Sequence, residues 1–196
     1  MSHHLRDDVS KRLGHLEATL SQPDFLQQTG LGNEIAFYIF AYDAACAPLV
    51  TSYLPKLTDA LALKGVNVVT LDMYQLALEV LAERDVLHKA FALEKDKGTA
   101  ALRKAIGRLL VTDNLIGQAK QHLAQPHNLV FLTGVGEAWP LLRSHTILNN
   151  LHDVVDAVPL VMFYPGTYSG QGLQLFSHLT DDNYYRAFPL LPPEPS

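Results

Sequence analysis

Short apolar runs alternate along the chain with longer amphipathic stretches, and this alternation predicts strands separated by helices. Apolar runs of strand length lie at Glu34–Tyr42, Val66–Leu71, Leu129–Thr133 and Pro159–Tyr164. Runs of this length between turn signals are typical of strands buried on both faces. Helices are expected at Leu5–Leu20, Ala47–Leu63, Tyr74–Asp85 and, with a break near Gly107, Lys89–Gln125.

The stretch from Leu129 to Gly172 is the most informative. Its first apolar run ends in a Gly-Val-Gly turn at 134–136, where glycine lets the backbone turn tightly. A helix is expected next, with Pro140 in its first turn, where the missing N–H costs little. The second apolar run ends at 165–166 in Pro-Gly, which is typical of a turn. Strand, turn, helix and strand form a βαβ unit, so the sequence predicts a parallel sheet.

The four strands and their intervening helices predict an α/β fold in a single domain over residues 1–196. The sheet is expected to be mostly parallel and four- to five-stranded, flanked by helices on both faces, and Rossmann-like or degenerate P-loop-like. Within the domain we expect an N-terminal helix at 5–20, an α/β core at 34–176 with a short edge strand at Gly172–Phe176, and an extended C-terminal segment at 181–196. The strand order stays open.

Composition narrows the class of protein. Hydrophobic residues make up 48% of the 196 residues and charged ones 18%, which argues against disorder over most of the chain. The net charge of -5 disfavours direct nucleic-acid binding. A single cysteine, Cys46, fits a reducing cytoplasm and is expected to be a buried thiol. No signal peptide is expected at the start, and no apolar run reaches the about 18 residues of a membrane helix.

Nucleotide-binding motifs are absent after the first predicted strand and at both glycine-rich segments. A P-loop needs glycines and a Lys-Ser/Thr pair, but the first strand is followed by DAACAPLV. A dinucleotide fingerprint needs a third glycine, and Trp139 stands in its place after the 134–136 turn. The segment Gly166–Gly172 has three glycines and no lysine, so it is expected to be a mobile loop rather than an anion-binding one.

Two aspartates follow the first two predicted strands. Asp43 and Asp72 would form a paired-carboxylate site if their strands were neighbours. The more common alternative is that each accepts hydrogen bonds from the backbone at the start of the next helix. Glu137 lies near a predicted helix start, where it suits the helix dipole and could pair with Arg143.

Other polar clusters have ordinary structural explanations. A small basic face, Lys97, Arg103, Lys104 and Arg108, is expected to be solvated, with nucleic acid or an acidic partner as the alternative. A helical row of polar residues is expected to face solvent or a partner: His145, Asn149, His152 and Asp156. The two histidines of that row are too far apart, about 10 Å along a helix, to share one metal ion.

Several segments resemble the BrxB family of the BREX bacteriophage-exclusion systems. They are FLTGVGEAWPLLRSHTILNNL (131–151), PLVMFYPGTYSGQGLQLF (159–176) and NYYRAFPL (183–190), with EIAFYIFAYD (34–43) also fitting. The patterns T-G-x-G-x-x-W-P-x-L-R and F-Y-P-G-x-Y carry the likeness. The residues Ala44–Pro48 after the first strand depart from the pattern, which leaves the role of that turn open.

The resemblance implies a core component of an anti-phage system that also marks host DNA by adenine methylation. Its partners would be other BREX proteins: the phosphatase-like PglZ first, then the ATPase BrxC and the methyltransferase PglX. The family carries no assigned catalytic residues, so no catalytic residue, cofactor or metal is expected. The predicted function is a non-enzymatic adaptor or assembly subunit.

Aromatic and arginine residues concentrate in the glycine-turn segments and the C-terminal segment, and both types are favoured at interfaces. The predicted interface residues are Trp139, Arg143, Tyr164, Tyr168, Tyr184, Tyr185 and Arg186. Two alternative functions stay open. One is a nucleotide-responsive or hydrolytic enzyme that uses the turn at Thr133–Glu137 with Asp43 or Asp72. The other is a DNA-binding accessory subunit that uses the basic face.

Overall fold

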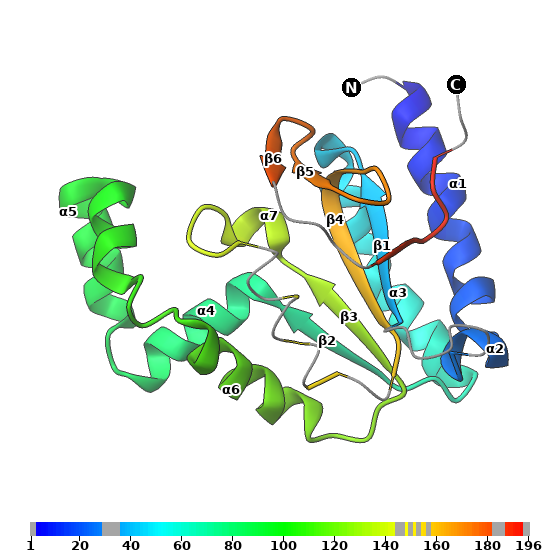
Figure 1. The fold of residues 1–196 in the computed structure, drawn as a ribbon, viewed down its shortest axis with the longest axis horizontal. Coiled ribbons are helices and arrows are strands. Elements are labelled where there is room, and N and C mark those ends of the chain that lie inside the picture. Colours follow the sequence, from blue (N-terminus) through cyan, green and yellow to red (C-terminus); the bar gives the residue numbers. More distant parts are fainter. Residues whose placement is uncertain are drawn as a thin grey trace.

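Five parallel strands form the centre of the molecule, in the order β2-β3-β4-β1-β7 (Figure 1). They are β1 (Phe37–Tyr42), β2 (Val68–Asp72), β3 (Leu129–Thr133), β4 (Leu160–Tyr168) and β7 (Phe188–Pro189). This computed structural model describes residues 3–28, 36–143, 148, 151, 154–155, 158–181 and 187–193. The mostly parallel α/β fold predicted from the sequence is confirmed.

β4 lies between β3 and β1 in the sheet, and it is parallel to both. β3 and β4, the two strands of the predicted βαβ unit, are parallel neighbours, with Val130 opposite Leu160. β1 pairs with β4 on its other side, with Phe37 opposite Leu160. The chain therefore passes over β4 and β3 between β1 and β2, and then returns one strand at a time.

Helices cover both faces of the sheet, as predicted. One face packs against α1 (His3–Leu20), the short α2 (Pro23–Leu26) and α3 (Ala47–Leu63). The other face packs against α4 (Met73–Glu83), α5 (Leu87–Ile106), α6 (Thr112–Leu123) and α7 (Val135–Ala138). In Figure 1, α5 lies furthest from the sheet.

The central strands are apolar on both faces because each face is covered. On β3, Phe131 packs toward α1 and α3, while Leu132 packs toward α4 and α6. On β4, Phe163 and Met162 divide in the same way, and all four side chains are 0–2% exposed. Burying each of these side chains contributes about 1.5–3 kcal/mol, so this double cover is the main source of stability.

The predicted helix Ala47–Leu63 has the bounds of α3 and includes Pro55. A three-residue turn of 3-10 helix, η1 (Ala44–Cys46), comes directly before it. The predicted break in the long helical region is also confirmed, because α5 ends at Ile106 and α6 begins at Thr112. α5 itself contains a second interruption at Gly98, whose φ of 78° is not helical.

The predicted place of Pro140 is wrong. α7 has only four residues and ends at Ala138, so Pro140 follows it instead of lying in its first turn. Trp139 adopts an extended conformation, with φ -72° and ψ 140°. A residue before proline is pushed away from helical geometry by the proline ring, which explains why the helix ends here.

The predicted turn at Pro165-Gly166 is also wrong. β4 runs through it to Tyr168 and pairs with β5 (Leu173–Leu175), which pairs in turn with β6 (Leu179–Asp181). Pro165 lies where β4 leaves the parallel sheet and begins the hairpin. Gly166 is opposite Leu175 there, and a side chain at 166 would overlap the carbonyl of Gln174. Most of the expected mobile loop is therefore a β-hairpin. The expected short strand is present as β5, but it is not an edge strand, because it pairs with both β4 and β6.

Candidate functional site

The carboxyl edge of the parallel strands gathers the polar residues that the sequence singled out. Asp43 follows β1 and Asp72 ends β2. β3 and β4 lie between these two strands, so the condition for a paired-carboxylate site of Asp43 and Asp72, that their strands are neighbours, is not met. The sequence could not show this, because strand order depends on how the helices pack and not on the local pattern.

Each aspartate instead caps the helical segment that follows it, as the alternative predicted. The Asp43 side chain accepts a hydrogen bond from the backbone N–H of Ala45 at 2.8 Å. Asp72 Oδ1 accepts from the backbone N–H groups of Tyr74 and Gln75, both at 3.0 Å. Such caps satisfy backbone donors that have no partner inside the helix.

Asp72 also ties β2 to β3. Thr133 lies opposite Asp72 in the parallel register, and its hydroxyl donates to Asp72 Oδ2 at 3.0 Å. The next residue, Gly134, has a left-handed φ of 70°. A Cβ there would overlap the Asp72 carboxylate, so this turn requires glycine for two independent reasons. The space beside Gly134 is held by a carboxylate, which repels a phosphate group.

A small pocket of about 180 Å³ opens at this edge. α3 forms one side of it, and the starts of α4 and α7 form the other. Its lining residues are Tyr42, Val50, Thr51, Leu54, Asp72, Tyr74, Gln75, Thr133, Gly134, Glu137 and Phe163. Because helices leave toward opposite faces here, the pocket lies in the kind of crevice where open α/β sheets bind ligands.

Tyr42 is the buried polar side chain of this pocket. It is 8% exposed, and the part of the chain that the structure describes gives its hydroxyl no hydrogen-bond partner. Burial raises the pKa of Tyr42 well above its ordinary value of 10.0, and the negative charge of Glu137 raises it further. The phenol is therefore neutral at physiological pH, so its oxygen can accept one hydrogen bond while its O–H donates another.

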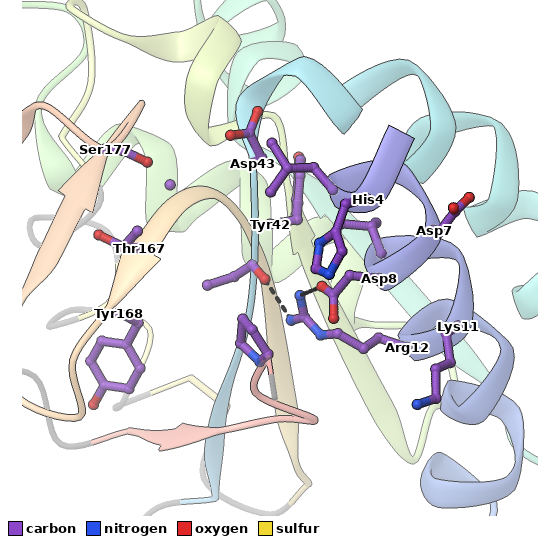
Figure 2. Close-up of a pocket in the computed structure, with 15 residues that line it drawn as sticks. His4, Asp7, Asp8, Lys11, Arg12, Tyr42, Asp43, Thr167, Tyr168 and Ser177 are labelled. Carbon is purple, nitrogen blue, oxygen red and sulfur yellow. Dashed lines mark hydrogen bonds and ion pairs between the residues drawn. The ribbon is translucent and has the colours of Figure 1, made fainter. Parts of the chain in front are cut away.

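A larger groove of about 820 Å³ lies between α1 and the carboxyl ends of β1 and β4 (Figure 2). Asp43, Thr167, Tyr168 and Ser177 line it from the sheet side, and the α1 side contributes His4, Asp7, Asp8, Lys11 and Arg12. Tyr42 lines both the groove and the small pocket. The groove thus has polar side chains on both sides, among apolar ones, and adjoins the pocket at Tyr42.

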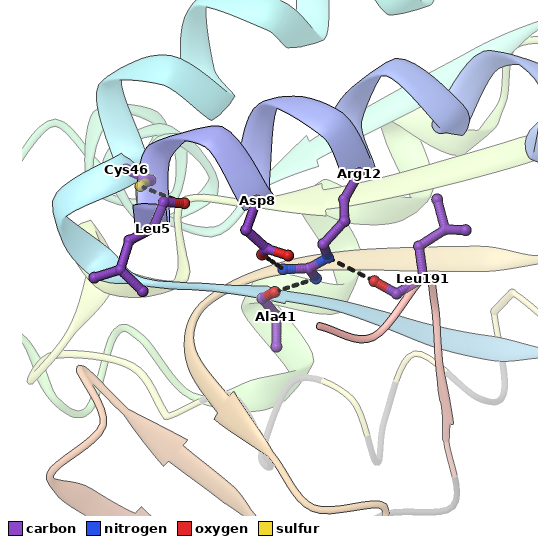
Figure 3. Close-up of polar contacts among 6 residues, drawn as sticks. All are labelled: Leu5, Asp8, Arg12, Ala41, Cys46 and Leu191. Carbon is purple, nitrogen blue, oxygen red and sulfur yellow. Dashed lines mark hydrogen bonds and ion pairs between the residues drawn. The ribbon is translucent and has the colours of Figure 1, made fainter. Parts of the chain in front are cut away.

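Arg12 joins three separate segments at the base of this groove (Figure 3). Its Nε donates to the carbonyl of Leu191 and its Nη2 to the carbonyl of Ala41, both at 2.6 Å. Its Nη1 lies 3.1 Å from Asp8 Oδ2, and the guanidinium carbon lies 4.6 Å from the ring centre of Phe40. Arg12 therefore fixes α1 to β1 and to the C-terminal segment.

The predicted interface residues differ in how far the structure exposes them. Trp139 is 42% exposed, and its ring meets Phe176 edge to face at 6.4 Å. Arg143 is exposed, and Tyr168 is half-buried, with its hydroxyl donating to the carbonyl of Ala187 at 2.7 Å. Tyr164 is 1% exposed, so its place in a surface interface is corrected: it belongs to the core. Tyr184, Tyr185 and Arg186 lie outside the described residues.

Three candidates from the sequence remain: the single cysteine, the basic face and the polar row. Cys46 is 1% exposed, so the buried thiol is confirmed, and burial raises its pKa. The four residues of the basic face are exposed, as expected. They do not share one continuous helix, because Gly98 interrupts α5 between Lys97 and Arg103, and Arg108 lies beyond the end of α5. The polar row from His145 to Asp156 lies outside the described residues.

Sequence reasoning missed Arg12 and Tyr42. Arg12 carried a weak signal, because it lies on the apolar stripe of α1 beside Leu13 and Leu16. An arginine in such a position needs a buried partner, and its acceptors come from backbone far along the chain. Tyr42 carried no distinct signal, since aromatic residues fill all of β1.

Two further features bear on the chemistry. Among the described residues, no group of three or more His, Cys, Asp or Glu side chains is placed to hold a metal ion. Within the same described residues, no helix is both long enough and apolar enough to cross a membrane.

Fold and site define an α/β protein with a parallel sheet, whose carboxyl edge carries a groove, a small polar pocket and an exposed tryptophan. The family model described as BREX protein BrxB matches residues 69–190. The chain is 44% identical over 188 residues to a BREX protein BrxB of Bacillus cereus (strain H3081.97), covering 93% of this chain and 97% of the relative.

A second relative supports the same assignment. The BREX protein BrxB of Escherichia coli O9:H4 (strain HS) is 37% identical over 182 residues, covering 92% of this chain and 90% of that protein. The chain belongs to the BrxB family of BREX proteins, as the sequence resemblance predicted. No solved structure matches the chain.

Proposed function

We propose that this protein is a cytoplasmic, non-enzymatic adaptor of a BREX phage-exclusion system, which holds other BREX proteins together through a surface centred on Trp139. PglZ is the partner proposed first, followed by BrxC and PglX. Membership of the BrxB family places the chain in a BREX system and makes other BREX proteins the natural partners.

The exposed indole of Trp139 is the observation that carries the proposal. Its 42% exposure coexists with an edge-to-face contact to Phe176, so the ring is held in place and still presents apolar surface. Tryptophan and arginine are enriched among residues that dominate binding energy at protein interfaces. Arg143, four residues further along, is exposed as well and adds a charged group to the same stretch of chain.

The non-enzymatic part of the proposal is supported by how the carboxylates are used. Asp43 and Asp72 accept backbone hydrogen bonds at the starts of helices. Asp72 accepts a further hydrogen bond from Thr133, so both of its oxygens are occupied. A general base acts within hydrogen-bond reach of the proton that it removes, whereas the described hydrogen bonds of both aspartates go to the protein's own backbone and to Thr133. The residues that a hydrolytic mechanism would use first therefore have structural roles.

Co-purification with PglZ tests the proposal. We expect Trp139→Ala to weaken binding by at least tenfold, as is typical for a tryptophan at the centre of an interface. Phe91→Ala is the matched control, because Phe91 is also a large exposed aromatic residue, at 53%, and lies on the distant α5. It should bind as the unchanged protein does.

Each variant is first compared with the unchanged protein by thermal unfolding. If folded Trp139→Ala protein still binds PglZ, BrxC and PglX with unchanged affinity, then Trp139 is not the centre of the interface. If the unchanged protein binds none of the three, then the adaptor function itself is wrong.

A further inference from the structure

The small pocket at the carboxyl edge combines negative charge with a buried, unused hydroxyl. Asp72 and Glu137 both line it, and its described lining contains no lysine, arginine or histidine. The Tyr42 residue is 8% exposed, and its hydroxyl has no partner among the described residues. An unsatisfied buried polar group is costly, so its presence in a pocket points to a ligand that completes its hydrogen bonds.

The negative charge of the pocket lining favours a cationic ligand over an anionic one. An anion such as phosphate would meet the carboxylates of Asp72 and Glu137 with no compensating cation on the pocket wall. The N-terminus of α4, which would attract an anion, is already capped by Asp72. A positively charged group is attracted by both carboxylates, and the hydroxyl oxygen atoms of Tyr42 and the threonines Thr51 and Thr133 are further acceptors.

The shape of the pocket selects the size of the ligand. Its volume of about 180 Å³ is well below that of pockets for nucleotides or drug-sized molecules, which begin near ~300 Å³. Val50, Leu54 and Phe163 give it an apolar wall beside the polar groups. A long aliphatic stem that ends in a cation matches this combination, since lysine and arginine place their stems on apolar surface and their charged ends among polar groups.

We infer that this pocket receives a single basic side chain, arginine or lysine, from a protein partner. The inference rests on the proposed adaptor function, since the partner supplies the side chain. Glu137 forms the ion pair with it, Tyr42 and the threonines contribute hydrogen bonds, and Phe163 contacts its stem. The pocket would then fix the register of a partner whose main contact is with Trp139.

The test uses the full chain and small probes. Backbone amide NMR spectra are recorded while N-acetyl-arginine amide, N-acetyl-lysine amide or the neutral N-acetyl-citrulline amide is added. We expect at least one of the two cationic probes to shift the amide signals of Thr51, Gly134 and Glu137, and citrulline to leave them in place. Tyr42→Phe and Glu137→Gln should each weaken that binding by about fivefold to tenfold, the effect of losing one hydrogen bond or one ion pair.

Asp59→Asn is the matched control. Asp59 is an exposed carboxylate on α3 outside the pocket, so its loss should not change the binding of either cationic probe. Equal shifts from citrulline, no shift from either cationic probe, or unchanged binding by Glu137→Gln would each overturn the inference. So would selective broadening of the pocket signals by Mn²⁺ without any probe, because the occupant would then be a metal ion. Since no partner protein is present, failure here is distinct from failure to co-purify with PglZ.

Discussion

The carboxylate of Asp72 occupies the space beside Gly134 that any side chain at position 134 would need. This contact links the end of β2 to the turn after β3. It also explains why a glycine-rich turn at the edge of a parallel sheet does not have the form of a phosphate-binding loop. In a phosphate-binding loop, backbone N–H groups of such a turn face an anion. Here an internal anion lies against the turn.

Gly134→Ala is expected to lower the free energy of unfolding by about 2–4 kcal/mol, because alanine at this φ is strained and its Cβ displaces Asp72 from its hydrogen bonds. Gly170→Ala is the matched control. Gly170 also has a positive φ, 86°, but a Cβ there would meet no atom within 4 Å. Its cost should be limited to backbone strain, about 1–2 kcal/mol. Urea denaturation measures both, and equal losses would contradict the role given to Asp72.

Arg12→Ala is expected to destabilise the protein by about 2–4 kcal/mol, since it leaves the partly buried carbonyls of Ala41 and Leu191 without their donor and Asp8 without its cation. Arg103→Ala on exposed α5 is the control and should change stability by about 0.5 kcal/mol or less. Denaturant titration of both variants makes the comparison. If Arg12→Ala behaved like Arg103→Ala, Arg12 would not be the residue that fixes α1 to the sheet.

Stability is expected to fall at alkaline pH. Burial raises the pKa of Cys46 and of Tyr42 above their ordinary values, so the folded state disfavours their ionised forms. The stabilising contribution is complete below the unfolded pKa values, about 8.5 for cysteine and 10 for tyrosine, and is lost as pH rises through the folded ones.

Urea unfolding at a series of pH values measures this decline. Cys46→Ala removes the thiol and should flatten the first part of the decline, between about pH 8.5 and 10, without changing the part due to tyrosine. Slopes against pH are compared rather than absolute stabilities, because the substitution also changes packing. An unchanged slope in Cys46→Ala would show that the thiol is not a source of the decline.

ATP with Mg²⁺ is expected to leave the melting temperature of the protein unchanged. A ligand that binds the folded state raises the melting temperature by mass action, and the pocket beside Gly134 is small and negatively charged. Thermal unfolding with and without millimolar nucleotide measures this. A concentration-dependent rise would favour the nucleotide-responsive alternative, and loss of that rise in Asp72→Asn would place the nucleotide at this edge.

The local sequence pattern was sufficient to predict most elements of the fold. Ala47–Leu63 and Leu129–Thr133 have the predicted bounds because the apolar period and the flanking proline or glycine agree there. The pattern was misleading at the two prolines near the functional edge. Pro140 ends α7 instead of beginning a helix, and Pro165 lies inside β4. In both places the backbone conformation depends on contacts with distant parts of the chain, such as the pairing of Gly166 with β5.

The candidate site was predictable only in part. The helix-capping roles of Asp43 and Asp72 follow from local chemistry and were anticipated. The pocket combines residues from β1, α3, β2, α4, β3, α7 and β4, and its formation depends on a strand order that no local signal encodes. Tyr164 illustrates the same limit, since a tyrosine at the end of a predicted strand can face solvent or the core, and here it lies within β4 and is 1% exposed.

Fluorine NMR of Trp139 shows directly whether PglZ covers this side chain when it binds. The chain contains one tryptophan, so protein labelled with fluorotryptophan gives a single signal that reports on this side chain. Unlabelled PglZ is added while complex formation is followed separately by size-exclusion chromatography. We predict that the signal shifts or broadens as the complex forms, because the exposed indole becomes covered. A complex that forms while the Trp139 signal keeps its position and width would contradict it.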